Sequence, residues 1–468
     1  MRGSATLEDL LLSNLSKIFN RAVQKGDRTA STPLRVQATR VRWSMAGLVV
    51  IILLVDSIDR ASFGIAGKYI QDEFRYSTQT MGWILSAFTL GYALFQIPWG
   101  YAGDRYGPRG VLTIAVLWSS LFTATMGLMP RFHASTWFSL ASLFFITRFL
   151  AGVGVAAAAP NSNKLVALWM SNEELGIGSS FSSIGTGIGG AMAPILITSA
   201  MEHWGWRASF YLCGVAGVIV AIAWRSYVTN RPEEHQKVNA EELEHIYSGK
   251  GADATSLRYA THLSTQPPWK TILSSRSVYS LILSYACQGY AAYIFYNWFY
   301  IYLVRVRGLT LTQGGLWGST PFIAMTVLAP VGGWFSDRAV RKFGKRRGRQ
   351  FGAWLGMGSS AVLLCAGAHT KNYILAIPLL ALAAGCNFFA VASWWAACID
   401  IAPNYSGSLS ALMNTCGNLG GWISPIITAL IAARFGWTQA LDVAALVSVG
   451  GGLLWLATDA SEPLEKPA

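Results

Sequence analysis

Long apolar stretches dominate the chain and alternate with short polar segments. Twelve of them are long enough to cross a hydrocarbon core as helices, because a spanning helix needs about 20 mostly apolar residues. They are Trp43–Ile65, Gln79–Ala102, Val111–Pro130, Ser135–Ala159, Gly176–Met201, Ala208–Trp224, Ser277–Val304, Gly308–Ser336, Phe351–Thr370, Asn372–Ile399, Ile401–Ala433 and Leu441–Thr458. The runs are continuous and do not alternate over about ten residues, so they predict helices and exclude barrel strands. We therefore predict an all-α polytopic membrane protein with twelve transmembrane helices.

The spacing of these segments predicts two bundles of six helices, residues 43–229 and 277–458, joined by a loop of residues 230–276. Residues 1–42 and 459–468 form the two tails. If the N-terminus is cytoplasmic, about 26 of the 36 Lys and Arg residues fall on the cytoplasmic side and about eight on the other. This asymmetry predicts that both tails and the inter-bundle loop are cytoplasmic.

Composition supports the membrane class and excludes several others. Of the 468 residues 53% are hydrophobic and only 13% are charged, where a soluble domain has about 25% charged residues. The net charge of +13 is carried mainly by loops, so it predicts contact with anionic lipid headgroups and no nucleic-acid partner. The first 42 residues lack the pattern of a secretory signal, and we expect them to form a cytoplasmic tail on the membrane surface. A transit peptide is the alternative.

The sequence contains no pattern typical of an enzyme or of a metal protein. The six cysteines lie in apolar stretches without metal-ligand spacing, so we expect buried free thiols. No nucleophile–base constellation or nucleotide-binding loop is present in the sequence. We therefore predict no cofactor, no metal site and no enzymatic activity.

A short motif occurs twice. Gly100-Tyr-Ala-Gly-Asp104-Arg105-Tyr-Gly107-Pro-Arg109 follows the second apolar segment, and Gly333-Trp-Phe-Ser-Asp337-Arg338 follows the eighth, 233 residues further along. An internal repeat of six spans is typical of a duplicated transporter, whose substrate site lies near the membrane midplane between the halves. The arginines offer bidentate donors to carboxylates on the same side of the membrane. A basic loop that only sets topology is the alternative.

Further segments match one transporter family in order along the chain. They are Asp59-Arg60-Ala61, Gly82 to Phe88, Gln96-Ile97-Pro98, Arg148-Phe149-Leu150, Gly205-Trp206-Arg207, Gly332-Gly333-Trp334, Ile401-Ala402-Pro403 and Asn414 to Asn418. With the paired motif, the chain resembles the anion:cation symporter family of the major facilitator superfamily, which includes bacterial sugar-acid and hexuronate transporters, sialin and the vesicular glutamate transporters. The resemblance implies a monomer in a bacterial inner membrane that works by alternating access. It also implies that the paired loops latch the cytoplasmic side in one conformation through Gly100, Asp104, Arg105, Gly107, Arg109, Gly333, Asp337 and Arg338.

Charged residues inside the predicted spans indicate where the function lies. The first span contains Asp56, Asp59 and Arg60, and the fourth contains Arg148. A charge at the bilayer centre costs ~2.5–3.5 kcal/mol on insertion scales, so such residues are kept for pairing or function. The i, i+3, i+4, i+7 spacing of Asp56, Asp59, Arg60 and Phe63 predicts one helix face that points into the central cavity.

Arg60 and Arg148 are the predicted receptor for a substrate carboxylate. Guanidinium stays charged and matches a carboxylate with two parallel hydrogen bonds. The family resemblance implies the same role for both positions. The alternative is a structural Asp–Arg pair that locks two helices.

The second half supplies neutral donors and aromatic rings. Its candidates for substrate binding are Tyr290, Tyr293, Asn297, Trp298, Ser393, Trp394, Asn414 and Asn418, with Tyr92 and Gln96 facing them from the second span. Amides and hydroxyls suit sugar hydroxyls, and rings suit the carbon face of a sugar. Packing is the alternative role for each aromatic residue.

Two departures from the family pattern concern coupling. Val155 stands where the family commonly has a glutamate that is taken to be a protonation site, and Asp56-Ser57 replaces the more usual Asn-Tyr. We therefore predict proton coupling through Asp59, with Asp56 as a second acid that compensates for Val155. The alternative for Asp56 is that it faces a water-filled vestibule or pairs permanently with Arg60.

The resulting prediction is a proton-coupled symporter of a small organic anion, such as a hexonate or hexuronate. An uncoupled or sodium-coupled anion carrier is the first alternative, favoured by Val155. The second is a transporter-like sensor that binds without carrying. A sensor would need an output domain, and neither the 42-residue tail nor the inter-bundle loop is long enough for one.

Overall fold

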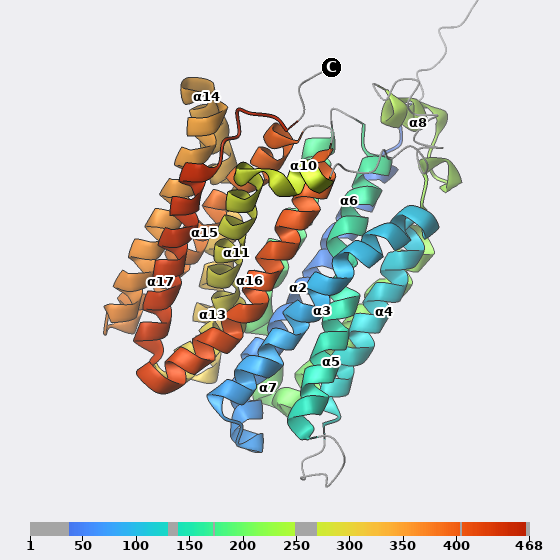
Figure 1. The fold of residues 1–468 in the computed structure, drawn as a ribbon. Helices are drawn as coiled ribbons and strands as arrows, with labels where there is room; N and C mark the ends of the chain where they lie inside the picture. The colour runs from blue at the N-terminus through green and yellow to red at the C-terminus, as the bar shows by residue number, and fades with distance from the viewer. Residues whose placement is uncertain (1–36, 130–138, 172–173, 249–268, 403–404, 465–468) are drawn as a thin grey trace, which may run out of the picture.

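The computed structural model describes residues 37–129, 139–171, 174–248, 269–402 and 405–464, which form helices packed side by side (Figure 1). In chain order the longer helices are α2 (Val41–Phe74), α3 (Thr78–Tyr106), α4 (Pro108–Gly127), α5 (Leu140–Val155), α6 (Ala158–Trp169), α7 (Leu175–Tyr227), α11 (Arg276–Asn297), α14 (Thr320–His369), α15 (Tyr373–Ile401), α16 (Ser406–Phe435) and α17 (Trp437–Leu454). The shorter ones are η1 (Pro232–Glu234), α8 (Ala240–Tyr247), α10 (Trp269–Ser274), α12 (Phe299–Arg305), α13 (Leu311–Gly318) and η3 (Trp455–Ala457). The prediction of an all-α membrane protein is confirmed.

The helices correspond to the predicted spans once two sharp bends are taken into account. Among the described residues, nine helices are long and apolar enough to cross a membrane. Two of these contain a non-helical glycine, Gly205 (φ 79°) in α7 and Gly344 (φ 80°) in α14, so each folds back as two legs. Both φ values lie in the left-handed region that glycine tolerates best. With these legs, and with α11 continuing into α12, each of the twelve predicted segments has a helical counterpart.

Polar caps set where several helices begin. The Ser77 and Ser139 side chains accept hydrogen bonds from backbone N–H groups in the first turns of α3 and α5, and Thr310 does the same for α13. A helix start has unpaired N–H groups, which a short hydroxyl side chain satisfies. These caps fix the first residues of the helices, Thr78, Leu140 and Leu311, whereas the apolar runs predicted starts at Gln79, Ser135 and Gly308.

Close helix crossings recur at matching places in the two bundles. A side chain on Gly152 of α5 would collide with the Phe88 carbonyl of α3, and one on Gly332 of α14 would collide with the Phe389 carbonyl of α15. Small residues let membrane helices approach to backbone distance. The second and fourth spans of each half therefore cross in the same way, as the internal repeat predicts.

The bundles are joined firmly at one end, which we call the Asp72 side, opposite to the end that carries α8. Here Asp72 of α2 forms an ion pair with Arg305 of α12. Thr312 Oγ1 of α13 also donates to Glu202 Oε2 of α7 at 3.2 Å. Among the described residues, the polar links between the bundles lie on this side or at mid-height. The structure is therefore a state closed on the Asp72 side.

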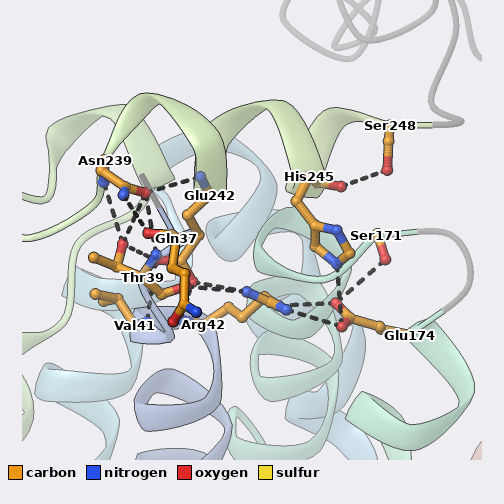
Figure 2. Close-up of polar contacts among 10 residues, drawn as sticks. All are labelled: Gln37, Thr39, Val41, Arg42, Ser171, Glu174, Asn239, Glu242, His245 and Ser248. Atoms are coloured by element: carbon orange, nitrogen blue, oxygen red, sulfur yellow. Dashed lines mark hydrogen bonds and ion pairs between the residues drawn. The ribbon is translucent and has the colours of Figure 1, made fainter. Parts of the chain in front are cut away.

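The inter-bundle loop contains more structure than the sequence predicts. Its helix α8 packs on the start of α2, where the buried Glu242 carboxylate accepts hydrogen bonds from the backbone N–H groups of Val41 and Arg42 at 3.1 Å each (Figure 2). Glu242 Oε1 also pairs with Arg42 Nη1 at 3.1 Å. A carboxylate at a helix N-terminus is favoured by the helix dipole and by the unpaired N–H groups.

A second carboxylate extends this network to α7. Glu174, next to the start of α7, pairs with Arg42 Nε at 3.0 Å and with His245 Nε2 at 3.2 Å (Figure 2). Burial alone would raise the pKa of Glu174, but the hydrogen bonds from Arg42 and His245 hold it below its usual value. The network thus fastens α8 to the first bundle. Of the predicted surface tail, residues 1–36 lie outside the described residues.

Replacement of Glu242 by Gln tests this attachment. The side chain keeps its size but loses the charge that pairs with Arg42, so we expect a loss of about 1.5–3 kcal/mol of stability. The measurement is the thermal unfolding midpoint of the purified protein in detergent, followed by tryptophan fluorescence. Glu244→Gln is the matched control, because Glu244 is exposed on the same helix. Equal midpoints for the two variants would show that the network contributes nothing.

Candidate functional site

A cavity of about 200 Å³ lies at mid-height where the two bundles face each other. Its lining comes from α2, α3, α6 and α7 of the first bundle and from α11, α15 and α16 of the second. The lining residues are Leu53, Asp56, Ser57, Arg60, Tyr92, Ala159, Thr186, Tyr285, Gln288, Gly289, Ala292, Tyr293, Tyr296, Phe388, Val391, Asn414, Gly417 and Asn418. A polar cavity at the bundle interface is where transporters of this architecture hold substrate.

A larger hollow of about 650 Å³ lies elsewhere, between the two legs of α14. It is lined mainly by aromatic and aliphatic side chains, among them Phe343 and Phe351, which are 46% and 37% exposed. This hollow does not lie between the bundles and offers few polar groups to a hydrophilic molecule. The smaller cavity is therefore the candidate site.

Arg60 is the cation of the cavity. Its Nη1 donates to the Tyr293 hydroxyl of the opposite bundle at 3.3 Å, and its guanidinium lies 4.5 Å from the centre of the Tyr92 ring. A guanidinium over an aromatic face is stabilised by the ring and keeps its edge free for an anion. The predicted location of Arg60 in the cavity is thus what the structure shows.

The helix face that reaches the cavity differs from the predicted one. Leu53, Asp56, Ser57 and Arg60 follow the i, i+3, i+4, i+7 pattern and line it. Asp59 and Phe63 do not, and they are 2% and 0% exposed. The prediction was wrong for these two, because the face that reaches the cavity is rotated about the helix axis, so that Leu53 and Ser57 take the places of Asp59 and Phe63.

Arg148 lies behind the cavity instead of lining it. Its guanidinium is held between the rings of Phe63 (4.9 Å) and Phe88 (4.5 Å), and the residue is 1% exposed. Its Nε and Nη1 have no hydrogen-bond partner among the described residues, and neither does Asp59 Oδ1. The two opposite charges attract each other inside the first bundle. The prediction that Arg148 and Arg60 together face the substrate is therefore not what this state shows.

A chain of hydrogen bonds crosses the interface beside the cavity. Asn414 Nδ2 of α16 donates to Gln96 Oε1 of α3 at 2.8 Å, and Gln96 Nε2 donates to the Tyr92 hydroxyl at 3.1 Å. On the opposite wall the Tyr293 hydroxyl donates to Asn418 Oδ1 at 2.9 Å. The cavity is thus lined, as predicted, by Tyr92, Tyr293, Asn414 and Asn418. Gln96 does not line it but is hydrogen-bonded to two residues that do, Tyr92 and Asn414.

Five predicted binding residues lie away from the cavity. Asn297 Nδ2 donates to the Tyr293 backbone carbonyl, and Trp298 Nε1 donates to the Pro425 carbonyl. Ser393 lies next to Ser336, and Trp394 packs between the rings of Tyr285 and Trp455. Tyr290 is buried and accepts a hydrogen bond from Ser424 at its backbone carbonyl. These residues join helices to one another, and for the aromatic ones, Tyr290, Trp298 and Trp394, this is the packing alternative.

The structure adds lining residues that the sequence analysis missed. They include Tyr285, Gln288 and Tyr296 of α11, and Gln288 Nε2 donates to Asn387 Oδ1 at 2.7 Å. With Tyr293 they follow an i, i+3, i+8, i+11 pattern along one helix face. Tyr290 and Asn297 fall outside that pattern, so helical phase was the signal that could have separated the two groups.

The repeated motif ties each loop to its own bundle. Asp104 pairs with Lys164 at 2.6 Å, and Asp337 pairs with Arg349 at 2.9 Å. Arg109 donates to the Arg225 carbonyl, and Gly107 has the positive φ (82°) that separates α3 from α4. The remaining motif arginines contact rings within their own bundle, Arg105 at Tyr106 and Arg338 at Trp334. None of these described contacts joins the bundles, as expected for a state held together on the Asp72 side.

Comparison with known proteins agrees with this architecture. Residues 49–425 match the family model of the Major Facilitator Superfamily. The solved structure of a bacterial homolog of the human lysosomal transporter Spinster, in an inward-facing and unoccupied conformation, is similar with a TM-score of 0.72. It shares 16% identity and covers 90% of this chain and 98% of that one. At this identity the likeness concerns the fold.

Sequence relatives are named as anion transporters. The chain is 30% identical to the probable galactarate/D-glucarate transporter GudP of Escherichia coli K12 over 404 residues, 83% of this chain and 87% of that protein. It is 29% identical to the ascorbate transporter of Arabidopsis thaliana chloroplasts over 419 residues, 88% of this chain and 74% of that protein. Members of this superfamily are transporters and not enzymes. The chain belongs to the major facilitator superfamily, among its anion transporters.

Proposed function

We propose that the protein carries a hydroxylated organic anion, such as a hexonate or hexuronate, across a bacterial inner membrane together with protons. The observation that supports this most directly is Arg60, a cation in a cavity between two bundles whose other lining groups are amides, hydroxyls and rings. Arg60 takes the carboxylate, Asn414, Asn418 and Gln288 bond the hydroxyls, and the tyrosine rings cover the carbon chain. The asymmetry of Lys and Arg supports cytoplasmic tails, and the transporter acts as a monomer.

Transport proceeds by alternating access. In this state Asp72–Arg305 and Glu202–Thr312 close one side. When the bundles rock, these contacts open and the motif residues of the two loops, with Asp104 and Asp337 at their centre, latch the α8 side. The contacts that each loop makes with its own bundle hold the motif side chains at the α8 side. This position supports a role as a latch on that side.

Charge balance supports proton coupling. Arg60 and Asp56 both line the cavity, so the empty cavity is neutral when both are ionised. A bound monoanion adds one negative charge, which protonation of Asp56 cancels. Behind the cavity, Asp59 is surrounded by Arg148, Thr123, Cys213 and Asp56, and its protonation releases the buried Arg148. An uncoupled or sodium-coupled carrier is the second candidate, favoured by Val155, which is 1% exposed in the first bundle.

The proposed function is tested by uptake into proteoliposomes. The purified protein is offered a panel of labelled sugar acids with and without an inward proton gradient. We expect uptake of hexonates or hexuronates that the gradient accelerates. Uptake whose rate does not depend on the proton gradient but rises with a sodium gradient would favour the sodium-coupled carrier.

Arg60→Ala should abolish both uptake and binding of the carboxylate, measured by calorimetry, because no other lining residue carries a positive charge. Arg60→Lys should rescue binding only in part, since the bidentate fork is lost. Arg148→Ala should also lose uptake, but with a lower unfolding temperature, because Asp59 is left as an unpaired buried charge. Arg276→Ala, at the exposed start of α11, is the matched control. Native binding by Arg60→Ala would contradict the assignment.

Asn414→Ala should raise the KM for gluconate by roughly ten- to hundredfold, as a lost hydrogen bond to a buried hydroxyl predicts. The KM for a simple carboxylate should change less. Gln96→Ala is the control, because it breaks the same bond between the bundles and leaves Asn414 in place. An equal effect of Asn414→Ala on both anions would mean that this residue only joins the bundles.

Asp56→Asn should retain counterflow exchange but lose accumulation driven by a proton gradient, because the cavity loses its titratable group. Val155→Glu in that background should restore part of the accumulation by returning an acid to the first bundle. Uptake by both variants is measured in proteoliposomes between about pH 5.5 and 8. Carboxylates with shifted pKa values titrate in roughly this range. Accumulation by Asp56→Asn with wild-type pH dependence would assign the proton to Asp59 alone.

A further inference from the structure

The cavity holds one positive and one negative side chain, and they are not paired. Arg60 and Asp56 lie one turn apart on the same face of α2, and both line the cavity. No ion pair of 4.0 Å or less joins them, although the structure describes both residues fully. Each is therefore available to a ligand in this state.

The rest of the lining is uncharged. The second bundle contributes amides and aromatic residues, chiefly Gln288, Asn414 and Tyr285, together with apolar side chains such as Val391. Arg148 does not line the cavity: it is 1% exposed and lies between the rings of Phe63 and Phe88. A ligand in the cavity thus has a single site for a carboxylate.

The direction of the ligand follows from α2. This helix runs from the α8 side towards the Asp72 side, so Asp56 lies one turn nearer to the α8 side than Arg60 does (Figure 1). Arg60 is held by the Tyr293 hydroxyl and the Tyr92 ring, at the closed side of the cavity. A ligand whose carboxylate lies at Arg60 can extend only past Asp56 or along the neutral wall of the second bundle.

We infer that Asp56 makes the cavity selective for monocarboxylates and excludes the corresponding dicarboxylates. A second carboxylate would meet the Asp56 carboxylate or amides without a compensating cation, and like charges in a site of low dielectric repel strongly. A hydroxymethyl group at the same place can donate a hydrogen bond to Asp56. When Asp56 is protonated this direct repulsion is absent, and the second carboxylate is then disfavoured only because Arg60 balances a single ligand charge.

The inference rests on the proposed function and narrows its substrate class. The expected preference differs from the names of relatives at about 30% identity, which specify galactarate and D-glucarate, both dicarboxylates.

Two sugar acids that differ in one group provide the test. D-Gluconate and D-glucarate share their chain and stereocentres and differ only at C6, a hydroxymethyl group against a carboxylate; D-galactonate and galactarate form a second such pair. Binding to the full chain in detergent is measured by calorimetry at pH 7.5. We expect the monocarboxylate of at least one pair to bind roughly tenfold more tightly, or better, than its dicarboxylate partner.

Variants separate the role of charge from that of shape. Asp56→Asn should lower the preference for the monocarboxylate. Binding of the dicarboxylate should become stronger, or should weaken less than binding of the monocarboxylate does. Val391→Lys adds a cation to the neutral wall and should strengthen dicarboxylate binding, whereas Val391→Gln, of similar length, should not.

The outcomes distinguish the inference from the function on which it rests. A dicarboxylate that binds as tightly as its monocarboxylate partner overturns the inference and leaves the proposed function standing. An unchanged preference in Asp56→Asn overturns the role of Asp56. If neither member of either pair binds while the protein remains folded by tryptophan fluorescence, the proposed function fails and the inference fails with it.

Discussion

The cost of placing a charge in a medium that cannot solvate it determines how this protein is organised. Four charged side chains lie at mid-height in the first bundle, and they are accommodated in two ways. Arg60 and Asp56 face a polar cavity. Arg148 and Asp59 lie behind it and attract each other, and the Arg148 guanidinium lies between the rings of Phe63 and Phe88. Because each solution depends on helix packing, a shift of the helices changes the free energy of every charge at once.

The second bundle is the neutral partner in this arrangement. Its wall is built from hydroxyl and amide groups that bond to one another, such as Tyr293 to Asn418 and Gln288 to Asn387. Such groups can exchange a protein partner for a ligand hydroxyl at small net cost, which a buried ion pair cannot do. The division between a charged and a neutral bundle follows the uneven distribution of ionisable residues along the sequence.

Much of the fold was predictable because each span is specified locally by its own apolar run and by the glycine or capped turn that ends it. The charges in the spans likewise identified Arg60, and the polar positions of the second half identified Tyr293, Asn414 and Asn418. The errors have one physical source. Successive side chains of a helix point about 100° apart around its axis, and composition does not determine how the helix is rotated towards the cavity. Asp59 and Asp56 were separated only by how the neighbouring helices pack, whereas Tyr290 and Tyr293 differ in helical phase along α11. The attachment of α8 was equally invisible, because Glu242 and Arg42 are 200 positions apart.

The attachment of α8 has a consequence for how the two halves move. Since Glu242 caps α2 and His245 contacts Glu174, the chain from Asn230 to Ser248 travels as part of the first bundle (Figure 2). Any change in the separation of the bundles then leaves the stretch from Asn230 to Ser248 in place on the first bundle. A spectroscopic label on the exposed Glu244 would therefore move with the first bundle. Its distance to a second label on α10 would measure how far the two elements separate during the transport cycle.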